Sequence, residues 1–178
     1  MVVNISTIED DSSLAKSAYI LDTNIILLLH RIQIDKQSLA GEYSKFISIL
    51  RDRKCRIIVS ALNVQEALNT IERSCWNRYK KGNGHVGRKE YRQIIAEQEK
   101  VREEQNVFFS QIKQFYDIEP ETITEGDLSK YMDSRTPHLY DPIDYIISEH
   151  HRKLGIVTDD TDFVQDDNVT VYTVCGKQ

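Results

Sequence analysis

Short runs of apolar and β-branched residues alternate along this chain with longer segments of helical periodicity, and this alternation limits the fold more than any other feature. Strands are expected over 18–22, 55–60, 156–158 and 169–174. Helices are expected just after the first strand and over 41–53, 62–76, 88–116, 124–132 and 141–153. Strands separated by helices pair in parallel and are buried by those helices. The sequence therefore predicts an α/β fold with a mainly parallel sheet.

The chain has the length of one domain. With 178 residues, of which 40% are hydrophobic and 29% charged, it can bury a core of its own. Residues 1–17 are polar and aperiodic, so we expect an N-terminal extension followed by a domain over 18–178. A glycine-rich loop, KKGNGHVG, and a long polar helical stretch indicate a helical hairpin that is inserted at about 76–140 and projects from the core.

Several classes of protein are disfavoured by composition. No run of about 18 apolar residues occurs, and the first residues lack the pattern of a secretory signal, so no membrane association is expected. The three cysteines are odd in number and lack CxxC spacing, which favours a reducing cytoplasm. The net charge of -5 argues against nucleic-acid binding by bulk positive charge alone, but acids that hold a cation would contribute to that total.

Four acids are expected at one edge of the sheet. Asp22 ends the first strand, Glu66 lies in the helix after the second, Asp144 begins a helix, and Asp160 follows a later strand. Ligands of open α/β sheets bind beyond the carboxyl ends of the strands. Oxygen ligands suit Mg²⁺ or Mn²⁺, and two such ions roughly 4 Å apart can activate water and stabilise the leaving oxygen in phosphodiester hydrolysis.

Three segments carry a resemblance to a known family, the PIN domain. The segment YILDTNIIL resembles its opening strand, and VSALNVQEALN resembles its second acidic block. The segment DYIISEHHRKLGIVTDDTDF resembles its third and fourth blocks, in which an acid precedes a glycine by eleven positions and a T-x-D-x-D-F motif follows. The matching positions are Asp22, Asn24, Glu66, Asp144, Gly155, Thr158, Asp160, Asp162 and Phe163.

The resemblance implies a PIN-like, three-layer α/β/α fold and a metal-dependent endoribonuclease that acts on single-stranded or structured RNA. It implies Asp22, Glu66, Asp144 and Asp160 as catalytic metal ligands, with Asp162 as an additional ligand. Asn24 and Thr158 would help to arrange the site. Toxin-type members of the family suggest a toxin or defence nuclease, which an antitoxin or regulatory protein would control.

Some of these residues have simpler explanations. Asp141 precedes Pro142 and suits a helix N-cap, yet it also competes with Asp144 for the third acidic place. Glu66 alone would read as a solvated helix residue. His150 and His151 point about 100° apart on a helix and lack a cysteine pattern, so we expect exposed side chains rather than a zinc site.

A basic segment lies in the expected hairpin. Its cations are Arg73, Arg78, Lys80, Lys81, Arg88, Lys89 and Arg92, and they are interleaved with Trp76, Tyr79 and Tyr91. Cations with aromatic rings suit single-stranded nucleic acid, through phosphate contacts and base stacking. An ordinary solvated hairpin, or a surface for a protein partner, explains the same composition.

Two other functions remain open at this point. A PIN-like module could bind RNA or a protein scaffold without cleaving, and a structure-selective DNA nuclease could use the same acids. The sequence also leaves open whether the chain forms a homodimer.

Overall fold

A wholly parallel sheet organises the part of the chain that the structure describes. The computed structural model describes residues 1–8, 14, 16–30, 32, 37–133, 142–164 and 168–174. Within them the sheet has six strands in the order β1-β6-β5-β2-β3-β4. The strands are β1 (Val2–Asn4), β2 (Ala18–Leu21), β3 (Arg56–Ser60), β4 (Asp117–Glu119), β5 (Gly155–Val157) and β6 (Thr170–Thr173). The predicted α/β class is confirmed, and the described sheet is parallel throughout.

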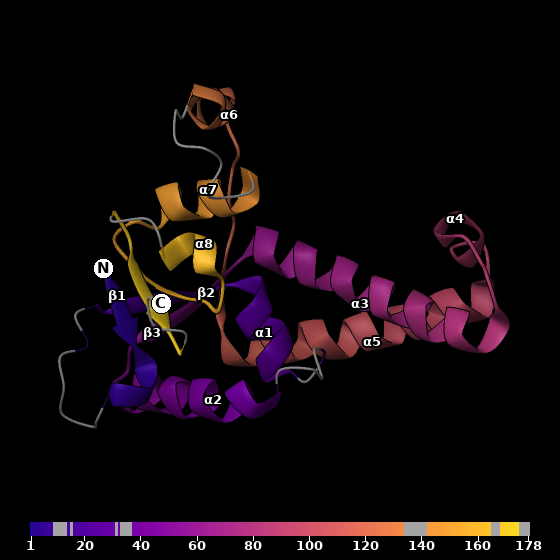
Figure 1. The fold of residues 1–178 in the computed structure, drawn as a ribbon, viewed down its shortest axis with the longest axis horizontal. Helices are drawn as coiled ribbons and strands as arrows, with labels where there is room; N and C mark the ends of the chain where they lie inside the picture. The colour runs from indigo at the N-terminus through magenta and orange to yellow at the C-terminus, as the bar shows by residue number, and fades with distance from the viewer. Residues whose placement is uncertain are drawn as a thin grey trace.

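Helices cover both faces of the sheet (Figure 1). The helices of the described residues are the 3-10 helix η1 (Ile5–Thr7), then α1 (Thr23–Leu29), α2 (Gln37–Asp52), α3 (Ala61–Asn83), α4 (Arg88–Tyr91), α5 (Ile95–Phe115), α6 (Glu125–Asp133), α7 (Pro142–His150) and α8 (Thr161–Val164). No helix within the described ranges is long and apolar enough to cross a membrane.

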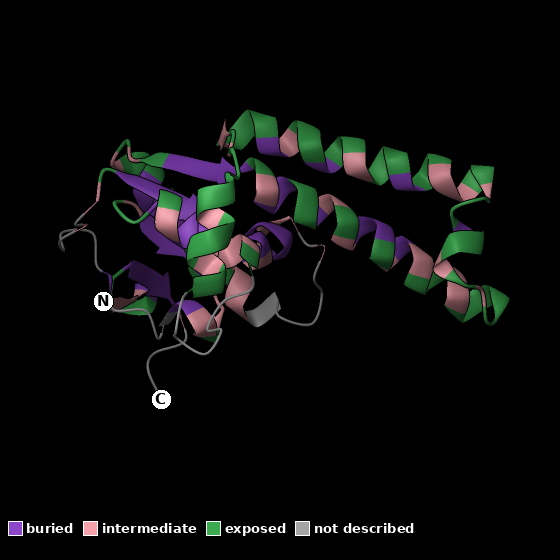
Figure 2. Cartoon of the chain, turned by 90° about the horizontal axis from the view of Figure 1, so that it is seen from above, coloured by how far each residue is buried: buried purple, intermediate pink, exposed green. Residues whose placement is uncertain are grey.

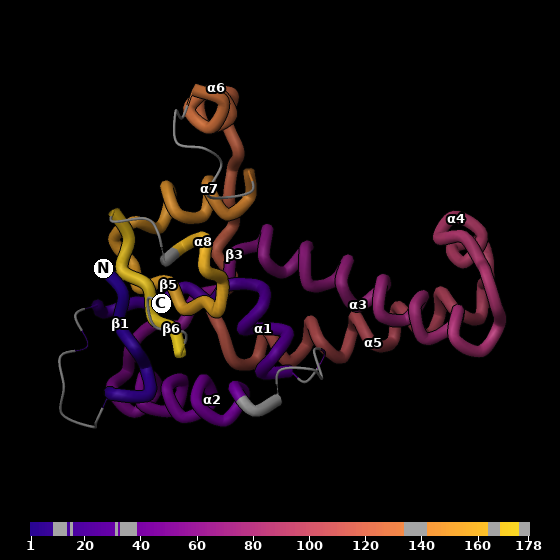
Figure 3. Tube along the Cα trace, viewed as in Figure 1, coloured from indigo at the N-terminus to yellow at the C-terminus, as the bar shows by residue number. Residues whose placement is uncertain are grey.

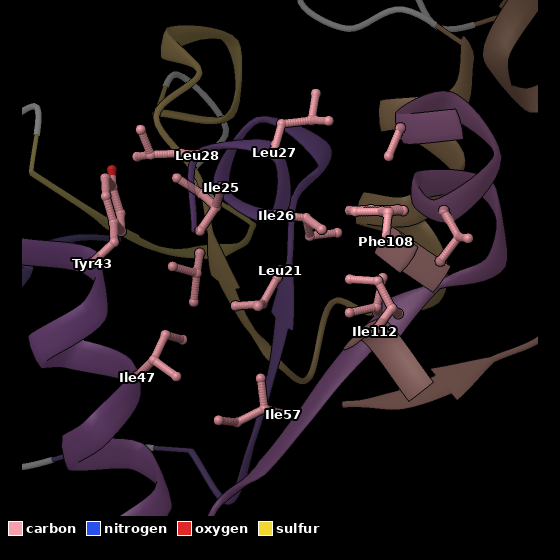
Figure 4. Close-up of a cluster of buried hydrophobic side chains, with 14 of the residues drawn as sticks. Leu21, Ile25, Ile26, Leu27, Leu28, Tyr43, Ile47, Ile57, Phe108 and Ile112 are labelled. Carbon is pink, nitrogen blue, oxygen red and sulfur yellow. The ribbon is translucent and has the colours of Figure 1, made fainter. Parts of the chain in front are cut away.

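Alternation along the strands divides the core in two. Tyr19 and Leu21 of β2 point to the face covered by α1, α2, α3 and α5, where the larger cluster of buried residues lies (Figure 4). Ala18 and Ile20 point to the other face, where Ile147 of α7 and Phe163 of α8 cover them. A strand that is buried on both sides reads as a continuous apolar run, which is why β2 is visible in the sequence.

The projecting feature is an antiparallel pair of helices, α3 and α5, with α4 at its tip (Figures 1 and 2). Val101, Phe108 and Ile112 of α5 are buried in the same cluster as Ile71 of α3. The hairpin projects from the sheet, and its first helix begins directly after β3. Residues 117–119, expected within the insertion, instead form the edge strand β4, so the insertion does not run unbroken from 76 to 140.

The expected N-terminal extension is partly wrong. Val2–Asn4 form β1, which pairs in parallel with β6 in the register Val2↔Val171. Ile5 and Ile8, just beyond this strand, are buried in the larger core. The strand escapes sequence reasoning because it has three residues and its partner lies almost at the other end of the chain.

Gly155 begins β5 between two aromatic rings. A Cβ at this position would lie 2.6 Å from a ring carbon of Tyr19 and 2.7 Å from one of Tyr172. The two rings are fully buried and pack edge to face, with centroids 5.0 Å apart. A side chain here would displace one of them, so close packing requires the glycine.

Candidate functional site

The carboxyl ends of β2 and β5 lie side by side at the point where the direction of the strand order reverses. From β2 the chain adds β3 and β4 on one side and then returns to add β5 and β6 on the other, as the trace shows (Figure 3). The helix after β2, α1, packs on one face of the sheet and the helix after β5, α8, packs on the other. Ligands of open α/β sheets bind at such a point, beyond the carboxyl ends of the strands. Asp22 follows β2, and Thr158 to Asp160 follow β5.

Asp22 is held in a fixed orientation at this point. It is the N-cap of α1, and its Oδ1 accepts a hydrogen bond of 2.6 Å from the backbone N–H of Thr23. Its Oδ2 accepts one of 2.6 Å from the hydroxyl of Thr158. The residue is only 8% exposed. Asp22 therefore caps a helix and at the same time joins the ends of β2 and β5.

Electrostatics around Asp22 oppose its ionisation. Burial is the largest cause and raises the pKa of its carboxyl to about 7 from the ordinary 3.8. The negative charges of Glu66 and Asp160 act in the same direction, whereas the hydrogen bonds from Thr158 and Thr23 lower the pKa. A buried carboxylate beside two further acids is the arrangement that a bound cation would stabilise.

Glu66 reaches the same place from α3. Its side chain is exposed, and Oε2 accepts a hydrogen bond of 2.7 Å from the hydroxyl of Thr23. That hydroxyl in turn accepts one of 3.0 Å from the side-chain amide of Asn63, which is fully buried in the first turn of α3. Thr23 thus contacts Asp22 with its backbone and Glu66 with its side chain.

Thr158 connects the remaining residues of the site. Its hydroxyl accepts hydrogen bonds from the backbone N–H of Asp160, at 2.9 Å, and from the side-chain amide of Asn24, at 3.4 Å. The Asn24 Oδ1 also accepts from the backbone N–H of Asp159, at 3.4 Å. The structure therefore brings Asn24, Thr158 and Asp160 together with Asp22, as the sequence predicted for this edge.

The other predicted ligands are placed less closely. Asp144 is half-buried in the first turn of α7. Asp162 is in the first turn of α8, and its backbone N–H donates to Asp160 Oδ1 at 2.9 Å. Asp141 lies outside the described residues, so its competition with Asp144 stays open. Within the described part of the chain, no three His, Cys, Asp or Glu side chains form a group that could hold a metal ion.

The donors nevertheless fit one kind of cation. Asp22, Glu66 and Asp160 offer carboxylate oxygens, which suit hard divalent ions, whereas zinc sites usually include cysteine or histidine ligands. Mg²⁺ keeps several waters and is usually held by one or two carboxylates and the substrate phosphate, so it needs no cage of three or four protein ligands. The described geometry is consistent with such an open site.

The expectation for the two adjacent histidines is half wrong. His150 is exposed, but His151 is only 8% exposed and its Nε2 lies 2.6 Å from Oε1 of Glu121. The second oxygen of Glu121 accepts a 2.6 Å hydrogen bond from the hydroxyl of Ser60, the N-cap of α3. His151 is buried because Glu121, thirty positions away, provides a polar partner that the local sequence does not reveal.

Part of the predicted basic arm is neutralised within the hairpin. The Arg92 Nε lies 2.6 Å from Oε1 of Glu72, and an Nη of Arg88 lies 2.7 Å from its Oε2. These bonds, that of Arg92 foremost, lower the pKa of Glu72 to about 2. Arg78 pairs with Glu104 of α5. These three arginines stabilise the hairpin, so they are less suited to bind nucleic acid than the sequence alone suggests.

The aromatic residues of the arm are also engaged. Tyr91 is fully buried and packs on Tyr79, with ring centroids 5.5 Å apart. The indole N–H of Trp76 donates to the carbonyl of Val86 at 3.0 Å, and the ammonium group of Lys80 lies 4.6 Å from the Trp76 ring centroid. These rings pack the tip of the hairpin, which disfavours the expected base stacking.

Two residues of the site were not found from the sequence. Thr23 follows Asp22 directly, and Asn63 precedes Glu66 by three positions. A usable signal exists for Asn63, since an amide in the first turn of a helix after a buried strand must find a partner.

Comparisons of the chain with family models, with curated proteins and with solved structures found no significant match.

Proposed function

We propose that this protein is a metal-dependent endoribonuclease that hydrolyses RNA phosphodiester bonds at the carboxyl ends of β2 and β5. The observation that carries the proposal is the buried Asp22 carboxyl with its raised pKa beside Glu66 and Asp160. The choice of RNA as substrate rests on the resemblance of the three acidic segments to PIN domains. The open donor set favours Mg²⁺ or Mn²⁺ as the cofactor.

Each residue of the site has a distinct role in this proposal. Asp22 and Asp160 would hold the divalent ion, and Glu66 would hold a second ion or a metal-bound water. Thr158 fixes the orientation of Asp22 through its hydroxyl, and Thr23 does the same for Glu66. When bound, the cation supplies a Lewis acid for the phosphate and lowers the pKa of the attacking water. Asp144 is a further ligand on the resemblance alone.

The test is a cleavage assay with matched variants. Labelled single-stranded RNA, structured RNA and single-stranded DNA are incubated with Mg²⁺, Mn²⁺ or chelator. Asp22→Asn and Asp160→Asn should each reduce the rate by about 100-fold or more, since each removes a charged ligand. Asp52→Asn removes an equal charge from an exposed position on α2 and should cleave like the wild type.

The outcomes separate the alternatives. Metal-dependent RNA cleavage that Asp22→Asn abolishes supports the proposal. RNA binding without cleavage of any substrate would contradict it in favour of a non-catalytic module. Cleavage restricted to DNA would contradict the proposal that RNA is the substrate, but it would support metal-dependent phosphodiester hydrolysis.

A further inference from the structure

One face of α3 carries a polar stripe that begins at the acidic site. The stripe residues are Glu66, Asn69, Arg73, Asn77 and Lys80. Steps of three or four positions keep side chains on one face of a helix. The first four of these residues are exposed and Lys80 is half-buried. The opposite face of α3 packs into the core through Val64, Ala67, Ile71 and Cys75.

Beyond Glu66 the stripe is free of negative charge. Glu72 is the one acid in the rest of α3, and it is only 8% exposed and bound by Arg88 and Arg92. The partner helix α5 differs, because its exposed surface includes the acids Glu99 and Glu103. The exposed surface of α5 also carries Lys100 and Arg102, so acids and bases are mixed there, whereas the stripe on α3 beyond Glu66 carries hydrogen-bond donors and no carboxylate.

The stripe is continuous with the site at its inner end. Glu66 accepts from the hydroxyl of Thr23, whose backbone N–H donates to Asp22. From Glu66 the stripe runs outward along the projecting helix to Lys80 (Figure 1). At about 1.5 Å per residue, its length is roughly 21 Å. A stacked single strand that rises roughly 3.4 Å per nucleotide would place about six nucleotides along it.

We propose that Asn69, Arg73, Asn77 and Lys80 form a track that guides the backbone of single-stranded RNA toward Asp22. Arginine, lysine and asparagine side chains are common donors to phosphate and sugar oxygens. The ammonium group of Lys80 lies over the Trp76 ring, 4.6 Å from its centroid. This inference deepens the proposed function and rests on it for the place of the scissile bond. It also assigns the recognition to α3, whereas Arg78, Arg88 and Arg92 hold the hairpin together.

Binding is measured by the fluorescence anisotropy of a labelled 12-nucleotide RNA in chelator, where no cleavage interferes. Arg73→Glu and Asn77→Asp each place a carboxylate on the track and should weaken binding about 10-fold, the size of one lost charged contact. Arg73→Glu should also reduce the slope of log affinity against log salt by about 0.7. The control is Arg102→Glu, the same change at an exposed position of α5. Its affinity should stay within about twofold of the wild type.

The length of the RNA gives a second measurement. Because the track spans about six nucleotides, the effect of Arg73→Glu should shrink when the RNA is shortened below that length. All variants change exposed side chains, and thermal melting verifies their fold. A parallel arm with single-stranded DNA tests whether the sugar contributes.

The failure of this inference is distinguishable from that of the nuclease proposal. If Arg73→Glu and Asn77→Asp bind like Arg102→Glu, or if the wild type binds no single strand, the track is refuted even where RNA is cleaved. If the track variants lose affinity but no metal supports cleavage, the track stands and the nuclease proposal fails.

Discussion

Replacement of Asp22 by asparagine should stabilise the metal-free protein, although it removes a residue of the proposed active site. The folded carboxyl has a pKa of about 7 against an ordinary value of 3.8. At pH 8 the charge must be kept in a buried position, which costs about 4 kcal/mol at 1.4 kcal/mol per tenfold change in proton affinity. Asparagine keeps an acceptor for the Thr23 N–H, but its amide group puts a donor where Oδ2 accepts from the Thr158 hydroxyl, so that bond is reversed or lost. Allowing for an imperfect replacement of these bonds, we expect a gain of about 2–4 kcal/mol.

The sign of the pH dependence follows from proton linkage. Between pH 4 and 7 the folded state binds the proton at Asp22 and the unfolded state has released it, so the stability of the wild type falls as the pH rises. The difference in the free energy of unfolding between Asp22→Asn and the wild type should therefore grow from about pH 4 and level off above about pH 7. A divalent ion should reverse it by stabilising the wild type alone.

Urea unfolding in chelator at several pH values between 5 and 8 measures this difference. Asp52→Asn, at an exposed position, is the control and should stay within about 0.5 kcal/mol of the wild type throughout. The reasoning is refuted if Asp22→Asn is less stable than the wild type at pH 8, or if the difference between them does not change with pH.

Three further predictions concern the scaffold. Gly155→Ala should destabilise the protein by about 1–3 kcal/mol in thermal melting, because its Cβ would meet the rings of Tyr19 and Tyr172; an unchanged melting temperature would contradict this packing. Lys54 has φ 56° at the end of α2, so Lys54→Gly should stabilise the protein by about 0.5–1 kcal/mol, and a loss in urea unfolding would count against strain there. The pKa of Glu72 lies near 2 in the folded protein, below its ordinary value of 4.5. Its ion pairs therefore contribute fully to the stability of the folded state above pH 4.5, and this contribution is lost as the pH falls toward 2. Glu72→Gln should remove that loss and lower hydrogen-exchange protection at the hairpin tip at pH 7, whereas unchanged protection would contradict the ion-pair assignment.

The central strands and the site near them were accessible from the sequence for one reason. A strand buried on both faces reads as an apolar run, and β2 and the Ile57–Val59 centre of β3 follow that rule. The carboxyl ends of parallel strands fall at one edge of the sheet, which predicts that Asp22 after β2 and Asp160 after β5 lie near each other. The edge strand β4 was not accessible, because its charged sequence pairs through Arg56 of β3, whose guanidinium lies 3.1 Å from Asp117 and 3.0 Å from Glu119.

The assignment of the basic arm required the structure for a different reason. Arg88 and Arg92 lie 16 and 20 positions from Glu72, and the turn at the hairpin tip brings them together. The sequence lists the cations of a segment, but it does not show which of them form ion pairs within the protein and which stay exposed. Helical periodicity does place Arg73 and Asn77 on the face opposite the core, so this part of the track could have been found from the sequence.

The position of β5 beside β2 also governs when the site can form during synthesis. Asp22 and Thr158, which share a hydrogen bond across these strands, are 136 positions apart. A nascent chain that has emerged as far as β4 already holds Asp22 and Glu66, but not the hydroxyl that orients Asp22 or the carboxylate of Asp160. Contacts so distant in sequence form late and slowly, since a long loop must close first. A ribosome would therefore carry a chain without a complete acidic site until β5 has emerged and paired.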